Sequence, residues 1–459
     1  MSLLKITDNH PWKALEQCNA TDEPVSQEDV DALARIANKP VEELVSQSDS
    51  NLLVFPPDLS RYGDEIGELS IFSMKQDGAG TCQIATGNLM GFIGRGDTQL
   101  TIGSRFNKNG KEDYFLHYML QRVFAINLFD LKHGIAHDAV FDFLLYLFPY
   151  YLKKALRQGL FKEYIRREHN DARVRGTINV SRHIRQNIPF TGNVAYDTRE
   201  HSYDNPITQL IRHTIEYIRT KPNGRMVLNN DAETKEAVRQ IVSATPTFAQ
   251  SNRAHIINEN VRPLRHPYFT EYTLLQKICL QILRHERIKF GNSHDKIYGI
   301  LFDGAWLWEE YLYTLLKENH FKHPQNKRRE GGIKMFLNPS VEDTFGHNSR
   351  RIYPDFFNED AGYILDAKYK HLNGSVGRDD LYQVVSYMHC MKAGRGGYLY
   401  PNDNGSKIQN YELAGHGGTI SVIPFDVPQD AVGWESFCQD ISKSESQLKV
   451  LTRSDSHAV

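Results

Sequence analysis

The order of secondary-structure patterns in the last third of the chain constrains its fold more than any other feature of the sequence. The expected order is helix, three strands, helix and strand, beginning near residue 291. The elements cover residues 304–318, 333–337, 352–357, 363–369, 379–392 and 397–400. Such an order builds a sheet covered by helices, so we expect an α/β (α+β) domain here.

Two regions of different character precede this domain. Residues 1–65 are polar and are expected to form a helical extension, in which Ser26 and Asp29 make the capping box of a helix. Residues 66–290 begin with four short strand patterns separated by glycine-rich turns, which indicates hairpins or a small barrel, and then become helical. The strand patterns cover residues 69–74, 82–86, 89–93 and 99–102, and the helical ones 113–128, 137–160, 205–220, 231–244 and 266–285. We therefore expect three domains: 1–65, a mixed β and helical region over 66–290, and 291–459.

Composition excludes several classes of protein. The 54 Lys and Arg residues nearly balance the 56 Asp and Glu residues, which excludes a wholly basic nucleic-acid binder but permits local basic patches. The five cysteines are far apart and none forms a CxxC pair, so neither a disulfide framework nor a zinc ribbon is expected. No apolar run reaches the roughly 20 residues that a membrane span needs, and the first residues do not resemble a signal peptide. We expect a soluble cytoplasmic protein without membrane contact.

The candidate site is a pair of aspartates on neighbouring strands. Asp355 follows Pro354, and Asp366-Ala367-Lys368 begins ten residues later. Mg²⁺ prefers oxygen ligands, so Asp355, Asp366 and the carbonyl of Ala367 can converge on one ion. Alternation along the strand puts Lys368 on the same face as Asp366. Its ammonium can then orient a water molecule and offset negative charge in the transition state of phosphodiester cleavage.

The alternative to a metal site is an ion pair at the edge of a sheet. Asp366 would then pair with Lys368 or Lys370 and hold no metal. However, Asp366 interrupts an otherwise apolar strand pattern over residues 363–367, and a buried charge is costly unless a metal or a partner compensates it. The surroundings of Asp366 therefore favour the metal site.

Three further residues are candidates for supporting this site. Gln383 and Tyr387 lie four residues apart on a helix whose expected N-cap is Asp379, so they share one face. There they can support the metal ligands or contact the DNA backbone; the alternative is a pair that only lines a helix–sheet contact. Glu309, on the upstream helix, can add another acid to the site. Glu310 is its rival, and solvated surface is the alternative for both.

These motifs resemble a known superfamily. Pro354-Asp355 and Asp366-Ala367-Lys368, followed by Gln383-Val-Val-Ser-Tyr387, resemble the PD-(D/E)xK nucleases, in the branch with a QxxxY helix. Four more segments resemble the McrC family, the nuclease subunits of McrBC modification-dependent (5-methylcytosine) restriction systems. They cover residues 89–102, 174–187, 204–207 and 307–311. The resemblance spans residues 66–425 and departs from the family at Ser104-Arg105, where a Pro-Lys pair is usual.

The resemblance implies a fold, an activity and a partner. It implies a restriction-endonuclease-like domain that cleaves double-stranded DNA in phage defence, with Mg²⁺ as cofactor and Mn²⁺ as a substitute. It assigns Asp355, Asp366 and Ala367 to the metal, Lys368 to the attacking water, and Glu309, Gln383 and Tyr387 to their support. It also implies that residues 66–290 bind and stimulate an McrB-like AAA+ GTPase hexamer, which reads the modified base. No GxxxxGK[ST] motif occurs, so this chain is expected to bind no nucleotide itself.

A basic segment between residues 166 and 185 has three interpretations. Its six arginines can grip DNA phosphates, dock on the partner ring, or line a solvated helix face together with interleaved acids. The arginines are Arg166, Arg167, Arg173, Arg175, Arg182 and Arg185, and the acids are Glu163, Glu168 and Asp171. The resemblance alone favours contact with the partner.

Two other functions stay open. One is a stand-alone PD-(D/E)xK nuclease of DNA repair or recombination, which would cleave DNA without any nucleotide. The other is a non-catalytic scaffold that activates an NTPase and carries a vestigial nuclease motif. The intact Asp355, Asp366 and Lys368 argue against the scaffold, because a decayed site is expected to have lost at least one of them.

Overall fold

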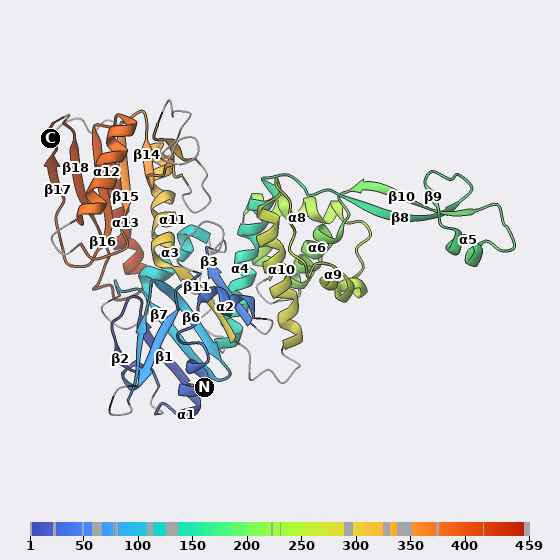
Figure 1. Cartoon of the computed structure of the whole chain (residues 1–459), viewed down its shortest axis with the longest axis horizontal. Coiled ribbons are helices and arrows are strands. Elements are labelled where there is room, and N and C mark those ends of the chain that lie inside the picture. Colours follow the sequence, from blue (N-terminus) through green and yellow to red (C-terminus); the bar gives the residue numbers. More distant parts are fainter. Residues whose placement is uncertain are drawn as a thin grey trace, which may run out of the picture. The chain divides into compact units, whose positions relative to one another are not determined.

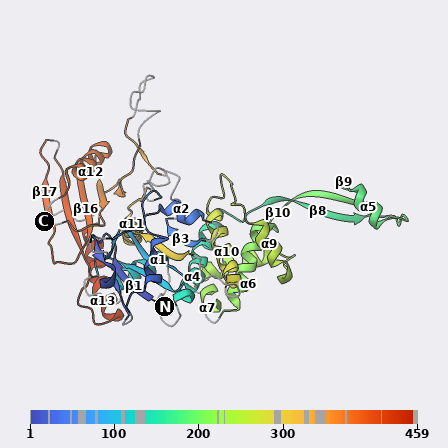
Figure 2. The ribbon, with the colours of Figure 1, turned by 60° about the horizontal axis from the view of Figure 1, so that its bottom comes forward.

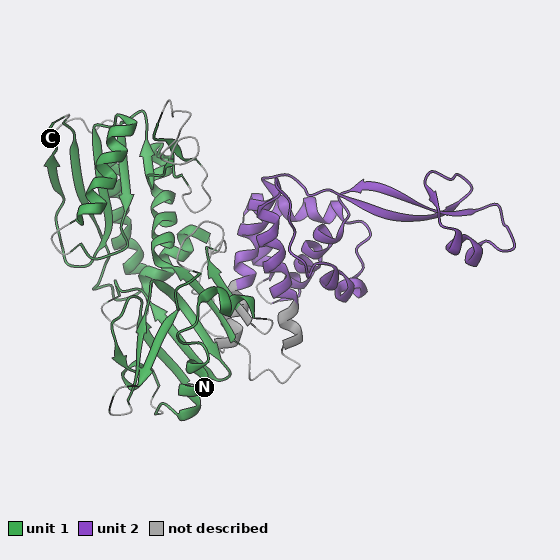
Figure 3. Cartoon of the chain, viewed as in Figure 1, with its two compact units in different colours: residues 1–128, 293–459 green, residues 129–292 purple. Residues whose placement is uncertain are grey.

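The structure is a computed structural model of the whole chain (Figure 1). It describes residues 2–21, 24–47, 50–56, 67–76, 78, 81–107, 113–124, 136–221, 224–229, 231–288, 297–324, 331–336, 351–372, 376–415 and 417–453. Of residues 50–51, 136–143 and 284–288 it describes the backbone alone. The chain forms two compact units (Figure 3): unit 1 comprises residues 1–128 and 293–459, and unit 2 comprises residues 129–292.

The N-terminal part of unit 1 is built on a five-stranded mixed sheet of order β1-β7-β6-β11-β3. The strands are β1 Ser2–Thr7, β3 Ser50–Phe55, β6 Leu89–Arg95, β7 Thr98–Gly103 and β11 Ile297–Asp303. β6 and β7 form an antiparallel hairpin, which confirms the hairpin expected there, while β1 runs parallel to β7 and β3 parallel to β11. Buried apolar side chains such as Leu4, Ile93 and Leu301 fill the core beside this sheet.

A smaller sheet and two short helices pack against the same core. The sheet has the order β2-β5-β4, with β2 Lys13–Ala14, β4 Phe72–Gln76 and β5 Cys82–Thr86. The helices are α1 Gln27–Ala34 and α2 Val41–Ser46. Ser26 caps α1, and Asp29 completes a capping box with it, as the sequence predicts.

The expected division into three consecutive domains differs from the observed architecture. Residues 1–65 are not a separate helical extension, because β1 and β3 complete the N-terminal sheet. The boundary near residue 291 lies within two residues of the end of unit 2, but β11, which follows it, pairs with β6 and β3 instead of joining the C-terminal sheet. The reason is physical: these strands find their partners far along the chain, and local periodicity carries no signal of such pairing.

The C-terminal part of unit 1 is a second five-stranded sheet of order β14-β15-β16-β18-β17. The strands are β14 Phe356–Asn358, β15 Tyr363–Ala367, β16 Arg395–Asn402, β17 Gln409–Glu412 and β18 Thr419–Asp426. The central β15, β16 and β18 are parallel, and β14 and β17 are antiparallel at the two edges. A parallel centre of this kind needs helices on both faces.

Helices do cover both faces of this second sheet. On one face, α12 (Arg378–Met391) packs Val384 and Met388 against Ile364 of β15. On the other face, α11 (Gly304–Leu316) brings the Trp308 ring to 5.5 Å from that of Phe425 on β18. The three layers confirm the α+β fold class for this part of the chain.

A buried polar cluster joins three helices of unit 1. Glu445 of α13 (Trp434–Leu451) accepts hydrogen bonds from the hydroxyls of Tyr118 at 3.1 Å and Tyr311 at 2.9 Å. The guanidinium of Arg122 forms an ion pair with the same carboxylate at 2.9 Å. Because Tyr118 and Arg122 belong to α3 (Tyr114–Phe124) and Tyr311 to α11, this cluster ties the N-terminal part of unit 1 to the second sheet.

Unit 2 combines a helical body with a long arm. The body contains α4 Ala136–Leu156, α6 Pro206–Arg219, α7 Gly224–Leu228, α8 Ala232–Ala244, α9 Arg253–Glu259 and α10 Glu271–Ile288. Asn205 caps α6 and Pro206 occupies its first turn, as the sequence predicts. None of the helices in the described ranges is long and apolar enough to cross a membrane.

The arm is a two-stranded antiparallel ribbon that extends from the helical body, as both Figure 1 and Figure 2 show. β8 (Glu163–Asp171) pairs along its whole length with β10 (Val194–Ser202). The short β9 (Thr177–Ile178) also pairs with β10, and α5 (Val180–Gln186) follows it. The arginine-rich segment is therefore mostly strand and turn, and the solvated helix face expected as one of its interpretations is wrong for residues 163–171.

Candidate active site

Asp355, just before the edge strand β14, lies opposite Asp366 on the neighbouring strand β15. In the β14–β15 ladder, Phe356 is opposite Leu365 and Phe357 is opposite Ile364. Continuing this register by one step sets Asp355 opposite Asp366, and residues opposite each other point to the same face of a sheet. That face is the one covered by α12, because Phe357 and Ile364 pack in its core.

The backbone of Ala367 fixes the Asp355 carboxylate at this edge. The Ala367 N–H donates a hydrogen bond of 2.7 Å to Asp355 Oδ2. Within an antiparallel ladder the N–H and C=O of one residue point to the same side of the strand. The Ala367 carbonyl therefore also points toward the side of Asp355, as a shared metal ligand would require.

Asp366 is a buried carboxylate with a cation beside it. It is 2% exposed, and its Oδ2 lies 2.7 Å from Lys368 Nζ. Burial raises the pKa of Asp366, and the nearby ammonium offsets only part of that effect. A second cation beside Asp366 would therefore further stabilise its ionised form.

Lys368 is held between two carboxylates. Its Nζ lies 2.7 Å from Asp366 and 3.0 Å from Asp380 Oδ1. Burial alone would lower the pKa of Lys368, but the two carboxylates outweigh it and raise the pKa, so the side chain is a cation at neutral pH. The edge-strand ion pair considered as an alternative is thus present, and it lies inside the candidate metal site.

Asp380 is a site residue that sequence reasoning missed. It also binds Lys370 Nζ at 2.8 Å, and partial burial of its carboxyl is outweighed by the two ammonium groups, which lower its pKa. The expected N-cap, Asp379, is not the cap, because α12 is capped by Gly377 and leaves the Asp379 side chain exposed. The sequence held a signal for it: Lys368 and Lys370 lie two residues apart, so in an extended segment they point to the same side, where one acid can pair with both.

Gln383 and Tyr387 lie beside the two aspartates. Gln383 Nε2 donates a hydrogen bond of 2.8 Å to Tyr387 Oη. Tyr387 is mostly buried, and burial raises its pKa together with the negative charges of Asp355 and Asp366. Tyr387 also packs in the core between α12 and the sheet. A place beside the aspartates and a place in the helix–sheet contact, which were considered as alternatives, are therefore compatible.

Glu309 comes from the opposite face of the sheet. It is half-buried on α11, one turn before Tyr313, whose ring packs 5.3 Å from that of His323. His323 Nδ1 donates a hydrogen bond of 2.6 Å to the carbonyl of Asp355. Sequence reasoning missed His323, which has no motif of its own and fixes the backbone of a site residue. A supporting role for Glu309 stays a prediction.

The oxygen atoms at this edge suit a hard divalent cation. Among the described side chains, no group of three or more His, Cys, Asp or Glu residues could hold a metal ion. A cation bound by Asp355, Asp366 and a backbone carbonyl would complete its coordination with water or phosphate oxygens. Mg²⁺ commonly binds in this manner, through one or two carboxylates and its substrate, so the residues fit that ion.

In the arm of unit 2, several of the arginines form ion pairs with acids of the arm itself. Arg182, one of the six arginines, is buried and pairs with Asp197 Oδ1 at 2.8 Å and with Glu168 at 3.0 Å. Arg166 also pairs with Asp197, and Arg167 pairs with Glu200 at 3.3 Å. In contrast, the far part of the arm exposes six apolar side chains. They are Val174, Ile178, Val180, Ile184, Ile188 and Phe190.

Comparison with known proteins gives a family. Residues 84–401 match the family described as "McrBC 5-methylcytosine restriction system component". Among solved structures, the chain is similar to one in the tetradecameric assembly of Thermococcus gammatolerans McrB AAA+ hexamers with bound McrC, at 16% identity and a TM-score of 0.43, covering 97% of this chain and 100% of that one. It is also similar to a chain in the cryo-EM structure of the Thermococcus gammatolerans McrBC complex, at 15% identity and a TM-score of 0.32, covering 70% and 89% respectively. No curated protein matches the chain.

Proposed function

This chain belongs to the family of McrBC 5-methylcytosine restriction system components, and we propose that it is the subunit of such a system that cleaves DNA. One observation carries the proposal: Asp355 and Asp366 lie opposite each other in the β14–β15 register, where the Ala367 N–H binds Asp355 and Lys368 pairs with Asp366. Carboxylates, a carbonyl and an ammonium at one point are the groups that metal-dependent phosphodiester hydrolysis needs.

Each residue has a distinct task in this proposal. Asp355, Asp366 and the Ala367 carbonyl hold Mg²⁺, for which Mn²⁺ substitutes. The ion, when bound, supplies Lewis-acid polarisation of the scissile phosphate. Lys368 orients the attacking water and offsets negative charge while the new P–O bond forms and the ester P–O bond breaks.

Asp380 and Tyr387 keep this machinery in place. When Asp366 engages another cation, Lys368 retains the carboxylate of Asp380 as a counter-ion and therefore stays at the site. Tyr387 lies near the two aspartates and accepts a hydrogen bond from Gln383. Glu309 completes the supporting set from α11.

We further propose that the chain works with an AAA+ GTPase and that the arm of unit 2 contacts this partner. The exposed apolar side chains support a protein surface over a DNA surface, because phosphates offer nothing for them to bind. Ile188 is 66% exposed and Phe190 is 67% exposed. Several exposed apolar groups within one short part of a chain, here between residues 174 and 190, are typical of protein–protein contacts. Arg166 and Arg182 are neutralised within the arm, so fewer of the six arginines are available for phosphates.

The test is plasmid cleavage by the full chain, isolated with the proteins that bind it. We expect cutting of methylated plasmid with Mg²⁺ and GTP, and a loss of at least about a thousandfold in Asp366→Ala. Asp379→Ala is the matched control, since its exposed carboxylate lies on the same helix turn as Asp380. It should cut at the wild-type rate.

Other outcomes lead to other functions. Cutting by Asp366→Ala at the wild-type rate would show that the site is wrong. Cleavage that needs Asp366 but no nucleotide would identify a stand-alone repair or recombination nuclease. A bound NTPase whose turnover rises, without any cleavage, would identify a scaffold.

A further inference from the structure

The segment that follows β15 contacts two parts of unit 1 at once. Lys368 and Lys370 point toward Asp380 on α12. Tyr369 and His371, which alternate with them, lie on the other side against residues that follow β7. The ring of Phe106 is 5.1 Å from that of Tyr369 and 4.5 Å from that of His371. One short stretch of chain thus carries a candidate catalytic lysine on one side and a contact with the N-terminal sheet on the other.

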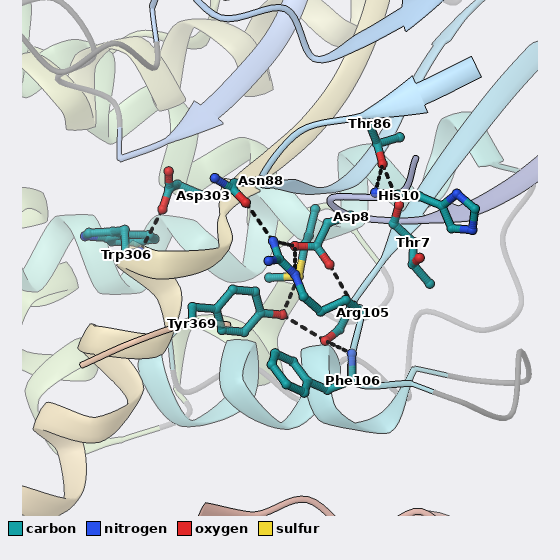
Figure 4. A network of polar contacts seen from close by, with 12 residues as sticks. Thr7, Asp8, His10, Thr86, Asn88, Arg105, Phe106, Asp303, Trp306 and Tyr369 are labelled. Atoms are coloured by element: carbon teal, nitrogen blue, oxygen red, sulfur yellow. Dashed lines mark hydrogen bonds and ion pairs between the residues drawn. The ribbon is translucent and has the colours of Figure 1, made fainter. Parts of the chain in front are cut away.

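Polar contacts and close packing hold Tyr369 within this stretch (Figure 4). Its hydroxyl lies 2.8 Å from Ser104 Oγ and donates to Met90 Sδ at 3.1 Å. Its ring packs so closely on the start of α11 that a Cβ at Gly304 would lie 2.6 Å from Tyr369 Cε1. Burial raises the pKa of this hydroxyl well above its usual range, so it remains a neutral hydrogen-bonding group.

A buried ion pair fixes the other side of this contact. The Arg105 guanidinium lies 5.0 Å from the centre of the Tyr369 ring, and its Nε donates a hydrogen bond of 2.9 Å to Asp8 Oδ2. Asp8 is 1% exposed and also accepts the Arg105 backbone N–H at 2.6 Å. Arg105 Nη2 reaches Asn88 Oδ1 at 2.7 Å, and the Asn88 carbonyl accepts the Gly304 N–H at 2.9 Å. The residues that hold Tyr369 therefore come from the start of β6, from the segment after β7 and from the start of α11.

We propose that Tyr369 is a positioning residue through which the N-terminal sheet sets the place of Lys368. This inference rests on the proposed nuclease function. Lys368 and Tyr369 share a peptide unit, which is planar and rigid, so a displacement of Tyr369 displaces Lys368. The Lys368 N–H donates a hydrogen bond of 2.8 Å to the Leu399 carbonyl of β16, which fixes the Lys368 backbone on that side. The contacts of Tyr369 fix it from the other side. A misplacement of about 1 Å at a catalytic group can cost on the order of a hundredfold in rate.

The conservative variant Tyr369→Phe tests this directly. It removes the hydroxyl and its bonds to Ser104 and Met90 but keeps the ring. The matched control is Tyr363→Phe on β15, six residues earlier: Tyr363 is also buried, and a guanidinium, that of Arg395, lies 4.1 Å from its ring. The assay is cleavage of methylated plasmid by the full chain with its GTPase partner, Mg²⁺ and GTP.

The expected result is a split between kcat and KM. Tyr369→Phe should lower kcat by about tenfold with KM for DNA unchanged, because DNA binding does not depend on the Tyr369 hydroxyl. Tyr363→Phe should lose a similar amount of thermal stability and keep kcat within about twofold. A role of Tyr369 in stability alone would make the two variants alike in kcat.

A second variant removes the same hydrogen bond from its other end. Ser104→Ala should also lower kcat, and the double variant should be no slower than Tyr369→Phe, because residues that share one interaction are not additive. The inference is overturned if Tyr369→Phe cuts like Tyr363→Phe, or if the effects of the two single variants multiply. Failure of the proposed function is a separate result, in which Asp366→Ala cuts at the wild-type rate.

Discussion

Asp366 in unit 1 and Asp197 in unit 2 are both buried aspartates on strands, and both face basic side chains. Asp197 accepts hydrogen bonds from Arg166, Arg182 and Asn179, which hold the pKa of that carboxyl below its usual range. The pKa of Asp366 is instead raised by burial, and its closest cation, Lys368, is shared with Asp380. One carboxylate is saturated with donors within the fold, while the other is left with capacity to bind. The difference indicates that similar charged strand patterns can serve structure in one region and chemistry in another.

The largest effect is expected for Asp366→Asn, which should abolish most cleavage without lowering stability. We expect Asp366→Asn to reduce cleavage by about a thousandfold and to leave the melting temperature within a few degrees of the wild type. The reason is that Lys368 keeps Asp380 as a counter-ion when the first carboxylate is neutralised. Plasmid cleavage and thermal unfolding measure the two quantities. A large fall in melting temperature would instead assign Asp366 the same structural role as Asp197.

The matching substitution in the arm, Asp197→Asn, should mainly increase local opening of the ribbon. Asp197→Asn leaves buried Arg182 with only the exposed Glu168 as its acidic partner, so the ribbon should open more often. We expect amide hydrogen exchange in β8 and β10 to rise by about tenfold, with exchange in β15 unchanged. Equal exchange in variant and wild type would show that Asp197 does not hold the arm together.

A third buried group extends the comparison to a side chain without polar partners. Neither ring nitrogen of His213 on α6 has a hydrogen-bond partner among the described residues. Burial, together with the charges of Arg253 and Arg212, lowers the pKa of His213 to about 4. The unfolded chain, with a histidine pKa of about 6.5, therefore takes up the proton first. Stability from the neutral ring is complete above about pH 6.5 and is lost as the pH falls toward about 4.

The measurement for His213 is thermal unfolding at two pH values. Between about pH 7 and about pH 5, the melting temperature of the wild type should fall by roughly 3–5 °C more than that of His213→Leu. Other titrating groups are common to both proteins, so the difference isolates the imidazole. Parallel curves would mean that His213 is protonated in the folded chain without cost.

The smallest effect is expected at Glu168. It pairs with the same Arg182 as Asp197 does, but its side chain is 69% exposed, and exposed ion pairs contribute little. Hydrogen exchange of the arm in Glu168→Gln should stay within about twofold of the wild type. An effect as large as that of Asp197→Asn would show that burial is not what distinguishes the two partners of Arg182.

Local features of the fold could be predicted from the sequence because their causes are local. The Ser26 capping box, the Asn205-Pro206 helix start and the β6–β7 hairpin each depend on residues a few positions apart. The contacts that bring Asp355 to Asp366 are also short-range, since one hairpin-like pairing of β14 with β15 suffices.

The remaining features depend on distant partners. β11 lies between β6 and β3, although roughly 200 residues separate it from β6. His323 and Asp380 enter the site through tertiary packing, which a linear pattern does not encode. The secondary structure of the arm is hard to predict for a related reason. Its interleaved arginines and glutamates also fit a solvated helix, and only the pairing of β8 with β10 makes this segment a strand.

The position of β11 has a consequence for synthesis of the chain. β11 is buried at every residue and is the strand that joins β3 to β6, so the N-terminal sheet is split until residues 297–303 exist. All of unit 2 is translated in the interval, which takes on the order of ten seconds at usual rates of elongation. On the ribosome, β1, β7 and β6 can pair early, but β3 and one edge of β6 wait for a segment encoded after the entire inserted unit. The oldest part of the nascent chain is among the last to be completed.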